Sequence, residues 1–309
     1  MRARFVFVAA VLGFTAVPLA SHAITLQVNC DQPRAKLPTI GAALQALSGL
    51  IGNLGPNTIE VTGACKENIT VDGISDLTLT AKNGASITDA SGGTTQVILV
   101  AHSTNFGLKG FAIRGGGGAP FNVGVLCIWN STCYLSSNDV QNPNGDAVAA
   151  ILGATVALDH DVLEQSDIGL FVFSGARAEV VAATLRNNAI GANVSFGSYY
   201  GDQGTTIANN SQFGLSVNNH SSAASGGDSI TGNGVGVLVN VQSEVGFSPL
   251  LGNTINGNGS GVSIGDQSWL TFLGPATVSG SGTQPDITCW GHFSGATGWG
   301  GVGTSNCPP

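Results

Sequence analysis

The sequence predicts an all-β solenoid with three short parallel strands in each coil, wound right-handed. The first observation is a phrase that returns along the chain: a β-branched or apolar residue, an Asn-rich polar turn, then glycine, apolar, any residue, apolar. It reads TLRNNAIGANV from Thr184, TIANNSQFGLSV from Thr206, SITGNGVGVLV from Ser229 and TINGNGSGVSI from Thr254. The second is composition, with 46 glycines, 42% hydrophobic and 9% charged residues, which suits many buried strands joined by tight turns. A period of 20 to 25 residues is typical of a solenoid, because a single coil cannot bury its own apolar face.

Strand alternation assigns faces within each coil, since successive side chains point to opposite sides. The residues that mark the coils are Gly124, Ala149, Gly169, Gly191, Gly214, Gly236 and Gly261. The first and third residues after a marker should point inward; these pairs are Leu170 and Val172, Ala192 and Val194, Leu215 and Val217, Val237 and Val239, and Val262 and Ile264. A second inward column should precede the polar turn: Val140, Val162, Leu185, Ile207, Ile230, Ile255 and Val278.

Asparagine recurs three residues after four of these anchors, at Asn188, Asn210, Asn233 and Asn258. A side-chain amide in a repeated turn can bond to the coils above and below it. We therefore expect a structural asparagine ladder here rather than a ligand site.

These motifs resemble the right-handed parallel β-helix, or pectate-lyase-like, superfamily. The resemblance runs from VNCDQPRAKLPTIGAALQAL and TIEVTGACKENITV, through LTLTAKNGASI, to the coil near Val278. It implies a single-stranded right-handed parallel β-helix with three sheets. It leaves the activity open, because one fold hosts many functions.

Both ends of such a solenoid need covers, because an open coil exposes strand edges and core atoms. Helical spacing of apolar residues predicts an amphipathic N-terminal helix, formed by Ile40, Ala43, Leu44 and Leu47. Residues 289–309 are expected to close the other end, with Trp290, Phe293 and Trp299 as a plug. The predicted organisation is a signal peptide over 1–23, the capped β-helix over 24–288 and the C-terminal cap over 289–309.

The first residues combine Arg2 and Arg4, an apolar run and the small-residue ending Ser21-His22-Ala23, which is typical of a cleaved secretory signal. We therefore expect a secreted or periplasmic protein without membrane insertion. The net charge of −8 and the lack of Lys or Arg after Arg186 argue against nucleic-acid partners.

Six cysteines in an exported chain fit three disulfides, and six allow 15 pairings. Proximity in sequence favours Cys30 with Cys65, Cys127 with Cys133, and Cys289 with Cys307. Metal binding is the rival interpretation, but no CxxC pair exists.

One outer sheet face should lack catalytic groups. Its two outward columns are Leu126, Ile151, Phe171, Asn193, Ser216, Leu238 and Ser263, and Ile128, Gly153, Phe173, Ser195, Asn218, Asn240 and Gly265. Neither column holds a carboxylate or a cation, and general acid–base catalysis needs titratable groups. The apolar part of this face is expected to be covered by the chain itself or to contact a partner.

An acidic coil, ALDHDVLEQSD, is the alternative location for chemistry. Its candidate catalytic residues are Asp159, Asp161, Glu164 and Asp167, with Arg186 one coil later. A carboxylate pair at Asp159 and Asp161 could serve hydrolysis or hold calcium. The alternative to both is a structural role, in which Asp161 occupies the same position of the repeat as Asp139 and Thr184 and forms hydrogen bonds within the turn.

Exposed aromatic residues beside polar groups are the candidate glycan-binding residues: Tyr199, Tyr200, Asp202 and Trp269. Aromatic rings stack on the apolar faces of sugars, and neighbouring carboxylates or amides hold the hydroxyl groups. A polysaccharide or cell-surface glycan is the predicted partner.

The function predicted from sequence is therefore an extracellular binding module, related to glycans, without the lyase or polygalacturonase strings of the superfamily. No cofactor is required for this role, and calcium is the one ion considered. The alternative is a carbohydrate-active enzyme, a polysaccharide lyase, glycoside hydrolase or epimerase, with its site in the acidic coil.

Overall fold

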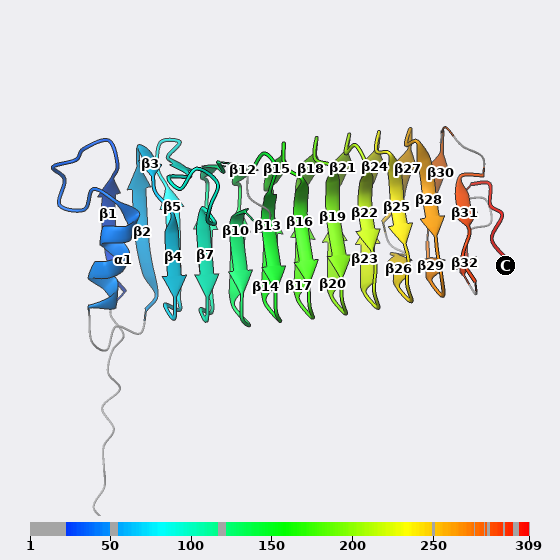
Figure 1. Cartoon of the computed structure of the whole chain (residues 1–309), viewed down its shortest axis with the longest axis horizontal. Helices are drawn as coiled ribbons and strands as arrows, with labels where there is room; N and C mark the ends of the chain where they lie inside the picture. Colours follow the sequence, from blue (N-terminus) through cyan, green and yellow to red (C-terminus); the bar gives the residue numbers. More distant parts are fainter. Residues whose placement is uncertain are drawn as a thin grey trace, which may run out of the picture.

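The computed structural model describes residues 23–49, 55–116, 122–248, 251–274, 276–280, 282, 285–292, 294–298 and 303–308. The predicted signal peptide, Phe293 and Trp299 lie outside these residues, apart from Ala23. The described chain forms a rod of stacked coils with a helix across its N-terminal end (Figure 1). No helix in these ranges is long and apolar enough to cross a membrane.

Three parallel sheets run along the rod, and every strand pairs with the equivalent strand one coil away. Sheet A contains β1 (Thr25–Asn29), β2 (Asn57–Thr62), β5 (Leu77–Ala81), β8 (Phe106–Lys109), β11 (Thr132–Ser136), β14 (Thr155–Asp159), β17 (Arg177–Val181), β20 (Tyr199–Gln203), β23 (Ser222–Gly226), β26 (Glu244–Phe247), β29 (Trp269–Phe272) and β32 (Gly295–Thr297). Sheet B contains β3 (Ala64–Lys66), β6 (Ser86–Thr88), β9 (Ala112–Arg114), β12 (Asp139–Gln141), β15 (Val162–Glu164), β18 (Thr184–Arg186), β21 (Thr206–Ala208), β24 (Ser229–Thr231), β27 (Asn253–Asn256) and β30 (Ala276–Ser279). Sheet C contains β4 (Ile69–Asp72), β7 (Ile98–Ala101), β10 (Val123–Ile128), β13 (Asp146–Ile151), β16 (Ile168–Phe173), β19 (Ile190–Ser195), β22 (Phe213–Val217), β25 (Val235–Val239), β28 (Ser260–Ile264) and β31 (Ile287–Cys289). The predicted three-sheet parallel β-helix is confirmed.

The core is a set of aliphatic stacks that run the length of the rod. All five predicted inward pairs, from Leu170 and Val172 to Val262 and Ile264, are fully buried. Each side chain contacts its counterparts in the coils above and below, so the buried apolar area grows with the number of coils.

Two register assignments from the sequence were wrong. In sheet B, Val140 pairs with Leu163, so Leu163 is the buried anchor and Val162 is half-exposed. In sheet C, Leu126 pairs with Ala149, which makes Ala147 the coil marker and moves Ile151 to the second outward column. Both slips have one cause: runs such as Val162-Leu163 are apolar on both faces, so alternation alone does not fix the register.

The asparagine ladder is present and lies at the turn between sheets B and C. The backbone N–H of Asn188 donates to Asn210 Oδ1 at 3.0 Å, that of Asn210 to Asn233 Oδ1 at 3.0 Å, and that of Asn233 to Asn258 Oδ1 at 2.8 Å. The amide of Asn210 also donates to Leu185 O at 3.2 Å. Ser166 extends the ladder, because its N–H donates to Asn188 Oδ1 at 3.0 Å.

The marker glycines explain why the coils approach so closely at this turn. A Cβ on Gly169, Gly191, Gly214 or Gly236 would lie 2.6 Å from the carbonyl oxygen of the next marker. It would also lie within 2.9 Å of the neighbouring ladder amide nitrogen. Glycine is therefore required by space at these positions, and the glycine column and the ladder depend on each other.

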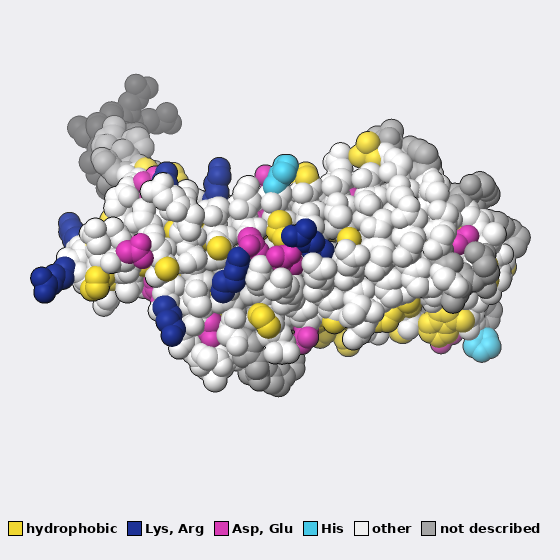
Figure 2. All heavy atoms as spheres, turned by 90° about the horizontal axis from the view of Figure 1, so that it is seen from above, with side chains coloured by type: hydrophobic (Ala, Val, Ile, Leu, Met, Phe, Trp, Pro, Cys, Tyr) yellow, Lys and Arg dark blue, Asp and Glu magenta, His cyan; other side chains and the backbone are white. Residues whose placement is uncertain are grey.

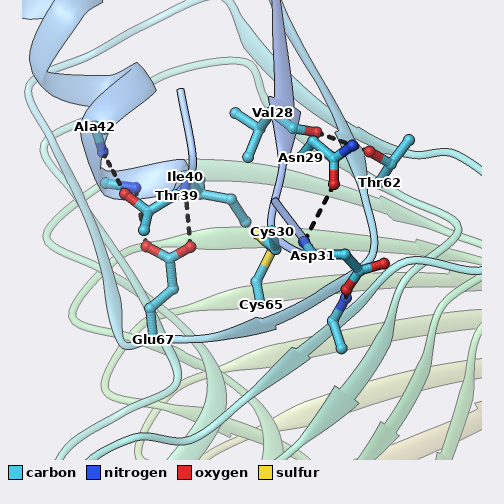
Figure 3. Close-up of a disulfide and its surroundings, with 12 residues drawn as sticks. Val28, Asn29, Cys30, Asp31, Thr39, Ile40, Ala42, Thr62, Cys65 and Glu67 are labelled. Atoms are coloured by element: carbon cyan, nitrogen blue, oxygen red, sulfur yellow. Dashed lines mark hydrogen bonds between the residues drawn. A yellow bond between two sulfur atoms is a disulfide. The ribbon is translucent and has the colours of Figure 1, made fainter. Parts of the chain in front are cut away.

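The N-terminal cap is built from one helix, one disulfide and one carboxylate. Helix α1 (Ile40–Ser48) buries Ile40, Ala43, Leu44 and Leu47, as predicted. Its first N–H groups are satisfied from the adjacent coil, where the Glu67 carboxylate accepts from Ile40 N at 2.8 Å and Gly41 N at 2.9 Å (Figure 3). An anion at a helix N-terminus is favourable, because it meets unpaired donors and the positive end of the dipole.

All three disulfides form the predicted pairs: Cys30–Cys65, Cys127–Cys133 and Cys289–Cys307. Strands β31 and β32 continue sheets C and A into the segment expected to be a cap. The plug role was wrong for Trp290: its ring is 55% exposed and its Nε1 donates to Ser263 Oγ at 2.8 Å on the outer face of sheet C.

Candidate functional site

The acidic coil does not gather its carboxylates into one site. Asp159 is exposed at the end of β14 in sheet A, where His160 Nδ1 lies 2.7 Å from its Oδ1. Glu164 lies on the outer face of sheet B and Asp167 lies at the entry to β16 in sheet C. Because these residues lie on different faces, the predicted catalytic group around Asp159 to Asp167 is not formed.

Asp161 is a structural turn residue. It is fully buried, and its Oδ1 accepts from Asn138 N at 2.7 Å and Asn138 Nδ2 at 2.8 Å, while its Oδ2 accepts from Asp159 N at 3.0 Å. Burial raises the pKa of Asp161 to about 6, although these donors lower it. Both carboxylate oxygens of Asp161 accept hydrogen bonds from the protein, so the pair Asp159 and Asp161 is not suited to bind calcium.

Its slot in the repeat was also misassigned. Val162, not Asp161, pairs with Asp139 and Thr184, so Asp161 belongs to the buried column of Asn138.

Glu164 and Arg186 form an ion pair on the outer face of sheet B. Arg186 Nε lies 2.7 Å from Glu164 Oε2, and Gln141 Nε2 donates to Glu164 Oε1 at 2.9 Å. A second pair, Arg114 with Asp139 at 2.6 Å, lies two coils nearer the N-terminus and joins β9 to β12. Dark-blue side chains gather in the N-terminal half of the face seen in Figure 2. The charges of Glu164 and Asp139 are each balanced by an arginine, which favours a structural role for this solvent-facing surface over a catalytic one.

The candidate glycan-binding residues separate into outward and inward groups in β20. Tyr199 points outward, and the Arg177 guanidinium lies over its ring at 4.2 Å from the centroid. Tyr200 is fully buried, so its ring has no face for a sugar and that candidate was wrong. Strand alternation places Asp202 on the same inward side, where Tyr200 Oη donates to Asp202 Oδ2 at 2.7 Å.

Sheet A brings Tyr199 and Trp269 into one outward column. Tyr199 pairs with Ser222, Ser222 with Glu244, and Glu244 with Trp269. Three strand spacings separate the two rings, a span of about 14 Å. Trp269 is 50% exposed and leans over Gly295, since a Cβ there would lie 2.6 Å from the indole ring.

Between the two rings the surface is hollow. The next outward column carries Gly201, Ala224 and Gly246, and nothing lies within 4 Å of the position of a Cβ on Gly246. Small side chains thus form the floor. We call this surface the sheet A trough, defined by Tyr199, Ser222, Ala224, Glu244, Gly246 and Trp269.

Three adjoining depressions make up the sheet A trough and its margins. One of about 240 Å³ lies between Trp269 and Glu244 and is edged by His220, Gln242 and Gln267. A second of about 250 Å³ lies beside Tyr199 and shares Ser222 and Glu244 with the first. The third, of about 420 Å³, shares Ala224 and Gly246 with the second and reaches Asp202. The trough has the exposed Trp269 ring at one end, the half-buried Tyr199 ring under Arg177 at the other, and hydroxyl, amide and carboxylate groups between them.

Asp202, which is half-buried, forms an acidic pair with buried Asp228 at the margin of the sheet A trough. Burial raises its pKa well above the ordinary value, and the charge of Asp228 raises it further. The pKa of Asp228 is also raised by burial, while Ser225 Oγ donates to Asp228 Oδ2 at 2.5 Å and Thr205 N donates to Oδ1 at 2.6 Å. The surroundings of Asp202 beside the third depression therefore favour its protonated form.

From Leu126 and Ile128 onward, the two sheet C columns predicted to be catalytically silent carry no charge, also after the register correction. Two coils before Ile128, the second column holds Asp72. Another carboxyl group lies just outside the two columns, at Asp146, the first residue of β13. Sequence analysis missed it, although Asp146 is the single charged member of a column that reads Val123, Asp146, Ile168, Ile190, Phe213 and Val235. A single charged residue in an otherwise apolar column could have indicated Asp146 from the sequence.

The described residues contain one group of three potential metal ligands, Cys30, Cys65 and Glu67. The two sulfurs form a disulfide and the carboxylate caps α1. This group is therefore structural.

Comparison with known proteins leaves the family unassigned. No protein-family profile matches the chain, and no curated protein matches it. Among solved structures, the chain is similar to the A-module of the mannuronan C-5 epimerase AlgE6 of Azotobacter vinelandii. The sequence identity is 14%, the match covers 87% of this chain and 95% of that chain, and the TM-score is 0.42. A match at this level carries no argument about function.

Proposed function

We propose that this chain is an exported glycan-binding protein that holds a neutral polysaccharide in the sheet A trough. The observation that carries the proposal is the column Tyr199, Ser222, Glu244 and Trp269, with exposed Trp269 at one end of a hollow floor and half-buried Tyr199 at the other. Aromatic rings stack on the apolar faces of sugar rings, and polar groups between them accept hydroxyl protons.

The charge of the trough favours neutral over acidic glycans. Glu244 lies on the floor, and none of the residues that line the three described depressions is a lysine or arginine. A uronic-acid polymer would bring carboxylates to Glu244, which is unfavourable, and Arg177 over Tyr199 at the far end of the trough is already paired with Glu179.

Export supports the same role. The disulfides fit an oxidising compartment, and the N-terminal segment has the pattern of a cleaved signal. A secreted rod with a sugar-binding face would meet polysaccharides outside the cell.

Isothermal titration against soluble neutral and acidic polysaccharides tests the proposal. We expect a neutral glycan to bind, and Trp269→Ala to weaken that binding by about tenfold, as is common for a central aromatic contact. Tyr134→Ala is the matched control, because Tyr134 is also 50% exposed on sheet A but lies on β11, outside the trough. Equal losses in the two variants, or no binding by any glycan, would contradict the proposal.

Glycan cleavage is the second candidate, favoured by Asp202 beside the third depression, because the raised pKa of this carboxyl favours its protonated form. A carboxylic acid kept protonated near a bound sugar can act as a general acid. Release of reducing ends by the wild-type protein, lost in Asp202→Asn while glycan binding is retained, would establish it. Binding without release would leave the binding role alone.

A further inference from the structure

A second groove lies on sheet C, away from the sheet A trough. Outward side chains of four successive coils, from β7 to β16, form its apolar cluster: Leu99, Ala101, Val123, Leu126, Ile128, Ala149, Ile151 and Phe171. The groove has a volume of about 320 Å³. Val123, Leu126 and Ile128 are buried although they point away from the core, so the floor is recessed between its neighbours.

A carboxyl group stands at one end of this apolar groove. Asp146 lines it and is half-buried, and Asp167 lies beside Asp146 one coil later, where Asp167 N donates to Gly145 O at 2.9 Å. Every ion pair of the described chain lies elsewhere, so neither carboxylate has a lysine or arginine partner there. Asp146 and Asp167 therefore make this end of the apolar groove acidic, and no lysine or arginine of the described residues offsets their charge.

The surroundings of Asp146 disfavour its charged form. Burial and, to a smaller extent, the neighbouring charge of Asp167 together raise its pKa to about 7. The strands that pack on β13 present apolar residues at this level, Val123 from β10 and Ile168 from β16, and Asp167 is the one other titratable group that faces Asp146. A bound cation would remove both penalties at once.

We propose that this groove binds a small molecule that has an apolar chain and a cationic amine head, with the amine at Asp146 and the chain along Leu126, Ala149 and Phe171. Strand geometry places Ala149 about 10 Å from Asp146, which suits a chain of several methylene groups. The apolar floor of the groove would bind the alkyl chain of the ligand, and the Asp146 carboxylate would bind its amine group.

Octylamine, octanol and octanoate are suitable probes, because they share a chain and differ in the head group. We expect the affinity order octylamine, octanol, octanoate in isothermal titration at pH 8. Hexylamine should bind more weakly than octylamine, by about fourfold for each methylene removed. Equal binding of the three octyl probes would overturn the proposal and leave a plain apolar surface.

The pH dependence separates the carboxyl from the apolar floor. Alkylamines stay cationic throughout this range, since their pKa is near that of lysine, so the change comes from the protein. We expect octylamine to bind about tenfold more tightly at pH 8, where Asp146 is ionised, than at pH 5.5, where it is protonated. Octanol should show no such change.

Asp146→Asn should reduce octylamine affinity at pH 8 and abolish the pH dependence, while octanol binding is retained. Asp159→Asn is the matched control, since Asp159 is an exposed carboxylate on sheet A. Ala149→Phe should fill the groove and reduce binding of both probes. If Asp146→Asn destabilises the protein, Ala149→Phe and the pH dependence of the wild type still decide the matter, and the glycan test on sheet A is unaffected.

Discussion

Two turns of the solenoid satisfy the backbone hydrogen bonds between adjacent coils with different side chains. At the turn between sheets B and C, each coil places a neutral amide under the next, and Asn188, Asn210, Asn233 and Asn258 satisfy one another's backbone groups. At the turn between sheets A and B, the buried column reads Asn138, Asp161, Ala183, Thr205, Asp228 and Asn253.

The acidic members of the second turn do the same structural work as asparagine. Asp161 Oδ1 accepts from Asn138 N as ladder amides accept from the preceding coil, and Asn253 Oδ1 accepts from Asp228 N at 3.0 Å. The carboxyl groups differ in one respect: they titrate in a buried place. The first turn should therefore be insensitive to pH, and the second should tie stability to pH.

The largest effect should come from breaking the amide ladder. Asn210→Ala removes an acceptor from buried Asn188 N and donors to Leu185 O and Asn233 Oδ1. We expect the free energy of unfolding to fall by about 3 kcal/mol, because buried groups are left unsatisfied. Urea unfolding measures this change.

Asn210→Ser is the conservative counterpart of that variant. Ser166 occupies the same column and accepts from Asn142 N at 3.0 Å, so a short hydroxyl can serve one rung. Its loss should be smaller than that of Asn210→Ala. Equal losses would mean that the ladder contributes through volume rather than through hydrogen bonds.

The next effect concerns Asp161 and appears in the pH profile. Its folded pKa of about 6 lies above the unfolded value, so the folded state binds the proton more tightly. The stabilisation is complete below pH 4 and is lost as the pH rises towards 6, by about 2 kcal/mol.

Asp161→Asn should flatten the profile between pH 4 and 6 in urea titrations at several pH values. Asparagine stands at positions 138 and 253 of the same column, so the substitution fits the turn. A profile equal to that of the wild type would show that Asp161 is ionised throughout.

The smallest effect is expected for the acidic pair. Asp202→Asn replaces a half-buried acid with a neutral amide, and its carbonyl can still accept from Tyr200 Oη. Because burial raises the pKa of Asp202, the wild type loses stability as the pH rises through the folded pKa, and the variant should lose less stability between pH 5 and pH 8. Thermal unfolding at pH 5 and pH 8 measures the difference, and an equal or larger loss in the variant would contradict it.

Sequence reasoning recovered the features that repeat. The inward pairs and the ladder follow from the repeat, because each coil has the same physical requirement. Helix α1 follows from the helical spacing of its apolar residues, and the disulfides follow from proximity in sequence. Register failed where an element is apolar on both faces, as at Val162-Leu163, because either residue could point inward.

The candidate site was harder to predict because it depends on register over several coils. Tyr199 and Trp269 were identified as exposed aromatics, but their common column follows from the strand pairing between them. Tyr200 and Asp202 were assigned outward because polar and aromatic residues are common on surfaces. Tyr200 and Asp202 instead point into the β-helix, and such departures from the usual surface pattern are common at special sites.

The interlocked glycine column and asparagine ladder also constrain how the chain length can change. Each ladder Asn forms its hydrogen bonds with the adjacent coils, and each marker glycine packs closely against the marker glycine of the next coil. Removal of one whole coil would bring Asn188 to Asn233 with every partner restored, whereas removal of a few residues within a coil would misalign all three sheets. Divergence of this rod should therefore proceed by gain or loss of complete turns, with free variation confined to loops such as the one between β26 and β27.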